Sequence, residues 1–161
     1  MILLTKIFHF EMAHAIHGYA GACRNIHGHS YELHVTVTGS EFYTDYIPAP
    51  GIVLDYKEIK SLVKSAVINQ LDHKMILSEA FLSENPFFTS QENLLCWEAE
   101  PTAENILVYI WNQLNEVFCN EIRLVYLKLY ETKDSYAEWI GDTITPALNR
   151  YQGRKFTETK K

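Results

Sequence analysis

Strict alternation of apolar and polar side chains over residues 29–38 is the sequence feature that most constrains the fold. Successive side chains of an extended chain point to opposite faces, so this pattern predicts a strand with one buried face. The apolar row is Tyr31, Leu33, Val35 and Val37, and the polar row is Glu32, His34, Thr36 and Thr38. Residues 2–14 predict a second strand, and residues 122–131 and 135–140 predict two more.

Two other segments follow the helical period. Asp55 is a good N-cap, and apolar residues recur every three or four positions after it. Thr102 precedes a second apolar stripe, which continues to about residue 118. The order strand, strand, helix, helix, strand, strand predicts an α+β fold in which an antiparallel sheet carries two helices on one face.

The strand predicted at residues 122–131 is apolar on both of its faces. One face would carry Val125, Leu127 and Leu129, and the other would carry Ile122, Leu124, Tyr126 and Tyr130. A small antiparallel sheet with helices on one side should leave its other face wet. We therefore expect another layer or a neighbouring subunit to cover the second face, and we favour a homo-oligomer.

A chain of 161 residues is long enough to bury a core and suits a single domain. We expect that domain to cover residues 1–161, with an irregular insertion at about 78–100 and a polar tail at about 152–161. No apolar run approaches the ~20 residues that span a bilayer. The N-terminus also lacks the features of a signal peptide. These patterns predict a protein that does not enter the membrane.

Cysteine usage and charge indicate the compartment and exclude one class of partner. The cysteines Cys23, Cys96 and Cys119 are odd in number and have no paired spacing, which argues against a disulfide framework. This usage predicts a reducing, cytoplasmic environment. The net charge of −6 provides no basic face, so we do not expect the protein to bind nucleic acid.

Three histidines could meet at one end of the first two strands. His27 and His29 are two residues apart and would point to the same side, while His14 ends the neighbouring strand. Three imidazoles with an open fourth position form the ligand set of a catalytic zinc site. Cys23 could instead supply a fourth, thiolate ligand to a structural site. The remaining alternative is that these are simply polar histidines at a strand edge.

Three further places carry candidate chemistry, and each also has a structural explanation. Asp72 could fix the tautomer of His73 and form a proton-transfer unit, or the pair could simply end a helix. Thr102 and Glu104 suit the first turn of a helix, so capping alone explains them. Glu131 follows the apolar row of the last long strand. It could accept two N–H bonds from the amidine edge of a heterocycle, or it could be an exposed residue at a hairpin end.

Six segments together resemble a known family. They are FEMAH, CRNIHGHSY, GIVLDYKEIK, LDHKMIL, PTAENILVYIW and LYET, which occur in this order within about residues 7–141. In order and type they resemble the 6-pyruvoyl tetrahydropterin synthase family. The resemblance implies the tunnelling fold (T-fold), a ββααββ unit of which three copies close a barrel and two trimers stack into a hexamer. It also implies active sites at subunit interfaces.

The resemblance assigns a role to each candidate residue. His14, His27 and His29 would hold zinc. Cys23 would be the catalytic base, with Asp72 and His73 as its proton-transfer partners. Glu131 would anchor the pterin with help from the segment that contains Thr102 and Glu104. The implied substrate is 7,8-dihydroneopterin triphosphate.

Two branches of the family share this site. Pyruvoyl-forming members stop after triphosphate loss and internal redox transfer, whereas carboxy-forming members also cleave the side chain and release acetaldehyde. Only three residues separate Cys23 from His27, a spacing that resembles the bacterial carboxy-forming branch of queuosine biosynthesis. The alternatives are a pyruvoyl-forming enzyme and a zinc protein that binds pterin without turnover. The negative net charge must be offset near the triphosphate, and Lys74 is one candidate.

Overall fold

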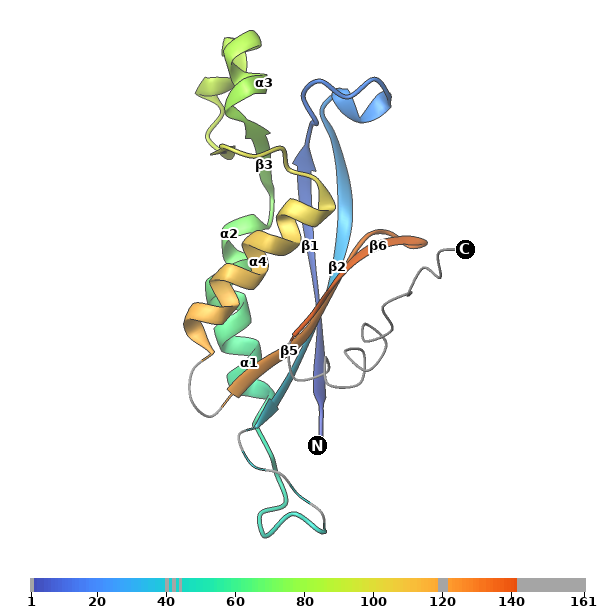
Figure 1. Ribbon diagram of the computed structural model, residues 1–161. Helices are drawn as coiled ribbons and strands as arrows, with labels where there is room; N and C mark the ends of the chain where they lie inside the picture. Colours follow the sequence, from blue (N-terminus) through green and yellow to red (C-terminus); the bar gives the residue numbers. More distant parts are fainter. Residues whose placement is uncertain (1, 40, 42, 44, 119–121, 142–161) are drawn as a thin grey trace, which may run out of the picture.

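A twisted sheet with helices packed on one face forms the body of the protein (Figure 1). The computed structural model describes residues 2–39, 41, 43, 45–118 and 122–141. Within these ranges the strands are β1 (Leu4–His14), β2 (His27–Gly39), β3 (Lys74–Ser78), β4 (Leu94–Trp97), β5 (Ile122–Thr132) and β6 (Ser135–Ile140). Their order across the sheet is β4-β3-β1-β2-β5-β6.

Two of the helices in the described ranges begin at the predicted N-cap residues. The helices of these ranges are α1 (Tyr56–Val63), a π-helical turn (Lys64–Ile68), α2 (Asn69–Leu71), α3 (Glu79–Glu84) and α4 (Ala103–Val117), with short 3₁₀ turns at Ala22–Arg24 and Pro86–Ser90. Asp55 caps α1 by accepting a bond from the amide of Lys57 at 2.7 Å. Thr102 caps α4 by accepting one from the amide of Asn105 at 3.3 Å. Both predicted helix starts are therefore confirmed.

The register of β1 with β2 determines where the candidate site forms. The two strands pair antiparallel along their length, from Leu4 opposite Val37 to His14 opposite His27. On the helix-covered face, Phe10 stacks on Tyr31 with ring centroids 5.1 Å apart. The same alternating row continues past this pair to His14, His27 and His29. The histidines therefore lie at the end of the hydrophobic core rather than on open surface.

The core fills the space between this sheet face and the two main helical elements. Figure 1 shows α4 lying alongside the α1–α2 helix, both across the same side of the long strands. The largest fully buried side chains come from both layers: Phe10, Tyr31, Leu33, Ile59, Leu71, Ile106, Ile110, Leu114, Leu127 and Leu129. This arrangement matches the predicted α+β plan of a sheet with two helices on one face.

The prediction of an irregular insertion at 78–100 was wrong. The segment contains α3, a 3₁₀ turn and β4, and with β3 it extends the sheet beyond β1. Both added strands pair parallel, β3 with β1 and β4 with β3, so the sheet is not purely antiparallel. Strands of four or five residues are too short to show a reliable period, which explains the error.

The predicted faces of β5 were also partly wrong. Thr36 pairs with Tyr126 but Val37 pairs with Leu124, so Val125 is an extra residue in a bulge. The bulge reverses the side-chain alternation before it. Ile122 is therefore buried in the core, and Leu124 packs against it, on the helix-covered face.

The face of the sheet away from the helices carries polar and aromatic side chains together with the exposed Ile7 and Ile140. The Lys128 ammonium lies 3.5 Å from the ring centroid of Tyr136 and 3.4 Å from a Glu138 oxygen. Nearby, the His34 imidazole lies 2.6 Å from Glu32.

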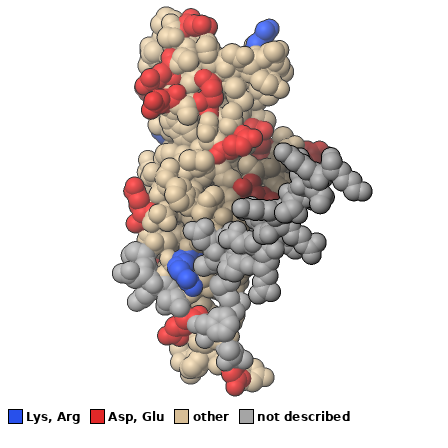
Figure 2. All heavy atoms as spheres, viewed as in Figure 1, with Lys and Arg blue, Asp and Glu red and all other residues tan. Residues whose placement is uncertain are grey.

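Acidic side chains outnumber basic ones on the surface seen in Figure 2, as the net charge of −6 leads one to expect. None of the helices in the described ranges is long and apolar enough to cross a membrane. The predicted polar tail at 152–161 and Cys119 lie outside those ranges.

Candidate active site

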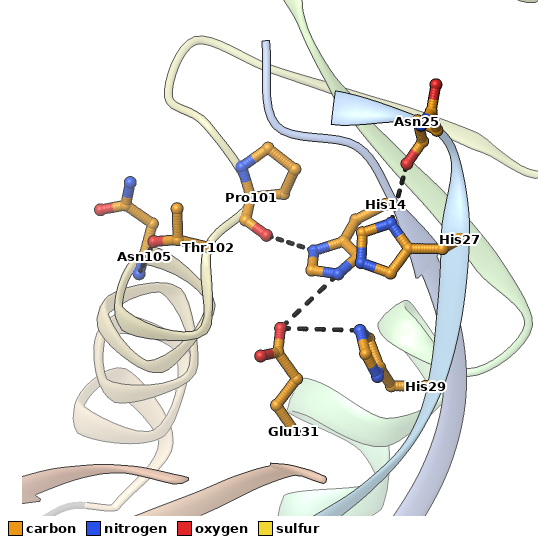
Figure 3. Close-up of polar contacts among 8 residues, drawn as sticks. All are labelled: His14, Asn25, His27, His29, Pro101, Thr102, Asn105 and Glu131. Carbon is orange, nitrogen blue, oxygen red and sulfur yellow. Dashed lines mark hydrogen bonds and ion pairs between the residues drawn. The ribbon is translucent and has the colours of Figure 1, made fainter. Parts of the chain in front are cut away.

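Three histidine side chains converge beside the N-terminus of α4. In Figure 3, His14 comes from the end of β1, and His27 and His29 come from the start of β2. One ligand atom of each ring lies within 4.8 Å of the others. Among the described residues, this group of possible metal ligands contains the three predicted histidines and does not contain Cys23. The geometry thus favours a three-histidine set over one completed by a thiolate.

Backbone carbonyl oxygens contact the Nδ1 atoms of two of the three rings. His14 Nδ1 lies 2.6 Å from the Pro101 carbonyl oxygen, and His27 Nδ1 lies 2.8 Å from the Asn25 carbonyl oxygen. A carbonyl only accepts, so each Nδ1 carries the proton and each Nε2 lone pair is left to face the cluster. Histidine ligands of metals are usually oriented in this way.

Burial supplies a second indication that the site fits a metal. The Nε2 atom of His14 is buried and has no hydrogen-bond partner among the described residues. Burial lowers the pKa of His14 below its ordinary value, even though the Pro101 carbonyl acts in the opposite direction. Burial likewise lowers the pKa of His29. Imidazoles that stay neutral at pH 7 can act as ligands, and an unpartnered buried lone pair needs a partner.

Glu131 lies across from the histidines (Figure 3). Its Oε1 atom is 3.6 Å from His14 Nε2 and 3.8 Å from His29 Nε2. The side chain is 28% exposed, so it sits between the buried cluster and the surface. Beneath it, burial and then the Glu131 charge raise the pKa of Tyr31, whose hydroxyl therefore stays protonated. The carboxylate can interact with a cation at the cluster or with a ligand at the surface.

A pocket of about 310 Å³ brings together four of the predicted residues. Its walls include Cys23, Thr102, Glu104 and Glu131. The first comes from the 3₁₀ turn after β1, the next two from the start of α4, and the last from the end of β5. Residues more than one hundred positions apart in sequence thus share one concave surface, as a binding site requires.

Asp72 and His73 do not share that pocket. His73 Nδ1 lies 2.9 Å from Asp72 Oδ1, so the predicted pair forms. The same Asp72 oxygen accepts a bond from the Glu11 amide at 3.0 Å, and the Glu11 carbonyl accepts one from the His73 amide at 2.7 Å. His73 has a φ of 60°, which turns the chain out of the helix and into β3.

His73 opens instead onto a second pocket of about 330 Å³. Lys74 lines it together with Glu11, Gly28 and Ser30. The sheet register places Glu11 opposite Ser30, one step out of phase with the pair Met12 and His29. Met12 and His29 also line this pocket, so it touches both faces of the β1–β2 ladder and reaches the edge of the histidine cluster. The imidazole of His73 is 79% exposed in the single chain.

Sequence reasoning missed several residues at the site. Pro101 contributes through its backbone, which no side-chain pattern reveals. Tyr31 was assigned only to the core, although its position two residues after His29 places it under the cluster. Tyr19, from the loop after β1, and Tyr136, from β6, line the pocket with Cys23, and no local sequence pattern indicates that they meet there. Asn105 lies in the quoted PTAEN motif, which could have identified it; its side-chain amide donates to the Glu100 carbonyl at 2.8 Å.

Comparison with known proteins decides the family. A family model described as 6-pyruvoyl tetrahydropterin synthase matches residues 3–142. The chain belongs to this family. Its relatives in the 6-pyruvoyl tetrahydropterin synthase family include the 6-carboxy-5,6,7,8-tetrahydropterin synthase of Haemophilus influenzae, 30% identical over 86% of this chain and 99% of that protein. The protein of the same name from Rickettsia typhi is 32% identical over the same shares. The human 6-pyruvoyl tetrahydrobiopterin synthase is 30% identical over 76% of this chain and 72% of its own.

Comparison with solved structures confirms the fold. The 6-pyruvoyl tetrahydropterin synthase of Caenorhabditis elegans superposes with a TM-score of 0.61 at 22% identity, over 88% of this chain and 96% of that one. An uncharacterised Wolinella succinogenes protein superposes with a TM-score of 0.70 at 16% identity, over 88% and 98%. The predicted α+β tunnelling fold and the family resemblance are both confirmed.

Proposed function

We propose that this protein is a zinc-dependent lyase that converts 7,8-dihydroneopterin triphosphate to 6-carboxy-5,6,7,8-tetrahydropterin, with release of acetaldehyde and triphosphate. The observation that carries the proposal is the position of Cys23, Glu131, Thr102 and Glu104 on one pocket. Glu131 also connects that pocket to the three-histidine cluster. Such a site can hold a pterin and a metal side by side.

Three observations support the choice of carboxy-forming chemistry. The relatives that match this chain over 99% of their own length carry the name 6-carboxy-5,6,7,8-tetrahydropterin synthase. The human pyruvoyl-forming relative is matched over 72% of its length. The compact spacing of Cys23 and His27 supports the same branch. The second candidate is therefore a 6-pyruvoyl tetrahydropterin synthase, which would eliminate triphosphate without cleaving the side chain.

The donor set supports zinc as the metal. Three imidazoles from neighbouring strands, with one ligand atom of each within 4.8 Å of the others, suit a catalytic zinc site. His14, His27 and His29 would hold it. When bound there, zinc supplies Lewis-acid polarisation of the oxygens on the substrate side chain.

The residues of the chain then divide the remaining work. Glu131 accepts two N–H bonds from the amidine edge of the pterin and fixes its orientation. Thr102 and Glu104 contact the ring from the first turn of α4. Cys23, as the thiolate, removes a side-chain proton, and His73 returns a proton while Asp72 holds its tautomer. The bond between the first and second side-chain carbons breaks; the first carbon stays as the carboxyl group, the other two leave as acetaldehyde, and the overall balance consumes water.

We further propose that the working unit is a hexamer of two stacked trimers with sites at subunit interfaces. In one chain, Cys23 and His73 open onto different pockets, so one copy does not bring the base to its partner. An exposed Asp72–His73 pair of one subunit could face the Cys23 pocket of the next. The half-buried aromatic side chains on the helix-free face, Tyr126 and Tyr130, are suited to line a barrel that oligomerisation closes.

The direct test is to incubate the purified protein with 7,8-dihydroneopterin triphosphate and to identify the products by mass. The proposal predicts 6-carboxy-5,6,7,8-tetrahydropterin. Accumulation of 6-pyruvoyl tetrahydropterin would support the second candidate. A bound pterin recovered unchanged would indicate the third possibility, a binding protein without turnover.

A further inference from the structure

The loop that carries Cys23 is held at its base by two adjacent backbone amides. The Ile16 amide donates to the Cys23 carbonyl at 2.9 Å and closes the loop on itself. The next amide, of His17, donates outward to Oε2 of Glu100 at 2.7 Å. Glu100 lies 83 residues later in the chain, so this bond ties the loop to a different part of the fold.

Glu100 is itself firmly attached to the start of α4. Its carbonyl accepts bonds from the Thr102 amide at 2.8 Å and from the side-chain amide of Asn105, also at 2.8 Å. The following residue is Pro101, whose carbonyl oxygen lies against Nδ1 of His14 at 2.6 Å. Figure 3 shows Pro101, Thr102 and Asn105 on one side of the cluster, with the proline carbonyl directed at His14.

We infer that Glu100 is a positioning residue that fixes the Cys23 loop relative to the metal ligand His14. The inference rests on the proposed role of Cys23 as base. Through two neighbouring residues, one segment contacts both halves of the site: Pro101 orients His14, and the Glu100 carboxylate holds His17. A carboxylate that accepts a backbone N–H forms a charge-assisted bond, which is stronger and more directional than a neutral one.

A second contact from α3 supports the loop at the same residue. The His17 imidazole lies 3.1 Å from Glu84, whose side chain is 69% exposed. This outer contact faces solvent, which weakens it. The inner bond, in which the Glu100 carboxylate accepts from the His17 amide, is partly buried and is the one that fixes the backbone. We therefore expect substitution of Glu100 to affect Cys23 more than substitution of Glu84.

The test uses full-length protein in which Cys96 and Cys119 are replaced by serine, so that Cys23 is the remaining thiol. Glu100→Ala removes the acceptor, and Glu100→Gln keeps a neutral one. Glu98→Ala is the matched control, since Glu98 is an exposed carboxylate two residues away. For each protein we would measure zinc content, kcat and KM with 7,8-dihydroneopterin triphosphate, and the rate at which iodoacetamide alkylates Cys23.

A displaced base slows the chemical step without weakening ground-state binding. We expect Glu100→Ala to lower kcat by about 10- to 100-fold with little change in KM, because small misplacements of a catalytic group cost about this much. Zinc content should stay normal, and alkylation should accelerate as the loop loosens. Glu100→Gln should recover about half of the loss on a logarithmic scale, because a neutral bond is roughly half as strong. Glu98→Ala should match the parent protein.

The outcomes separate this inference from the proposed function. An inactive parent protein would refute the proposed function, and the alkylation rates would still test whether Glu100 holds the loop. An active parent with unchanged kcat and alkylation in Glu100→Ala would overturn the inference alone. If Glu100→Ala does not fold, as far-UV circular dichroism would report, Glu100→Gln decides: a lower kcat at normal zinc content supports the inference, and parent values contradict it.

Discussion

The carbonyl oxygen of Pro101 lies 2.6 Å from Nδ1 of His14, and the buried Nε2 atom of the same ring has no hydrogen-bond partner among the described residues. A proline carbonyl cannot donate, so the contact selects the tautomer in which Nε2 is a free acceptor. Pro101, which directly precedes the N-cap Thr102 of α4, thereby orients a candidate metal ligand at the end of β1. Assembly of the site therefore depends on the contact between the segment before α4 and the end of β1.

The purified protein is expected to carry about one zinc ion per chain, as a three-histidine catalytic site does. His27→Ala and His29→Ala should each lose most of the metal, because each removes one of three protein ligands. His34→Ala is the control, since His34 contacts Glu32 away from the cluster. Elemental analysis after gel filtration measures the content. Full zinc retention in the His27→Ala/His29→Ala double variant would refute the assignment.

Cys23→Ala should retain zinc and the fold but lose about 10²- to 10⁴-fold in turnover, the usual contribution of a positioned base. The control is Cys96→Ala, because Cys96 is exposed on β4, away from the pocket. Steady-state rates and zinc content, measured on the same preparations, separate lost chemistry from lost metal. A Cys23→Ala protein with a near-normal rate would end the assignment of Cys23 as base.

Glu131→Gln should weaken pterin binding while leaving zinc in place. An amide cannot accept two N–H bonds from an amidine edge, and hydrogen bonds to charged groups contribute about 1.5–3 kcal/mol, or roughly 10- to 100-fold in affinity. Binding of a non-reacting pterin by calorimetry measures the effect. Because Glu131 lies 3.6 Å from His14 Nε2, the zinc content of the Glu131→Gln variant must be measured too. Loss of zinc with unchanged pterin affinity would make Glu131 a metal ligand rather than the pterin anchor.

Shared sites predict complementation between inactive variants. Cys23→Ala supplies an intact Asp72–His73 pair, and His73→Ala supplies an intact Cys23. If these groups meet across an interface, unfolding and refolding the two together should restore about a quarter of the parental sites, because random assembly in a symmetric oligomer pairs them that often. Each variant refolded alone is the control. A mixture no more active than its components would place the whole site within one chain.

The parts of the fold that could be predicted are those with long, regular patterns. Residues 29–38 alternate over enough positions to specify a strand and its buried face, and the cap at Asp55 marks a real helix start. The strands β3 and β4 are too short for a period to emerge, and β3 follows directly after His73, where the chain turns at a φ of 60°. The bulge at Val125 is likewise invisible, since an extra residue reverses the alternation without changing composition.

The candidate site divides in the same way. The histidine row could be predicted, because His27 and His29 are two residues apart and β1 ends in His14. The contacts of Pro101 and Glu100 could not, because a backbone carbonyl carries no sequence signal and the partner of Glu100 lies 83 residues away. The separation of His73 from the Cys23 pocket could not be predicted either, because it depends on how segments distant in sequence pack against the sheet.

Acetaldehyde formation tests the central claim most directly, because both branches of the family release triphosphate and only carbon–carbon cleavage releases acetaldehyde. The purified protein, supplied with zinc, would be given 7,8-dihydroneopterin triphosphate, with alcohol dehydrogenase and NADH present to report acetaldehyde as it forms. The Cys23→Ala variant, which should lack turnover, measures the background signal. We predict acetaldehyde in equal amount to the substrate consumed, together with the mass of 6-carboxy-5,6,7,8-tetrahydropterin. Substrate consumption with triphosphate release but without acetaldehyde would contradict the assignment.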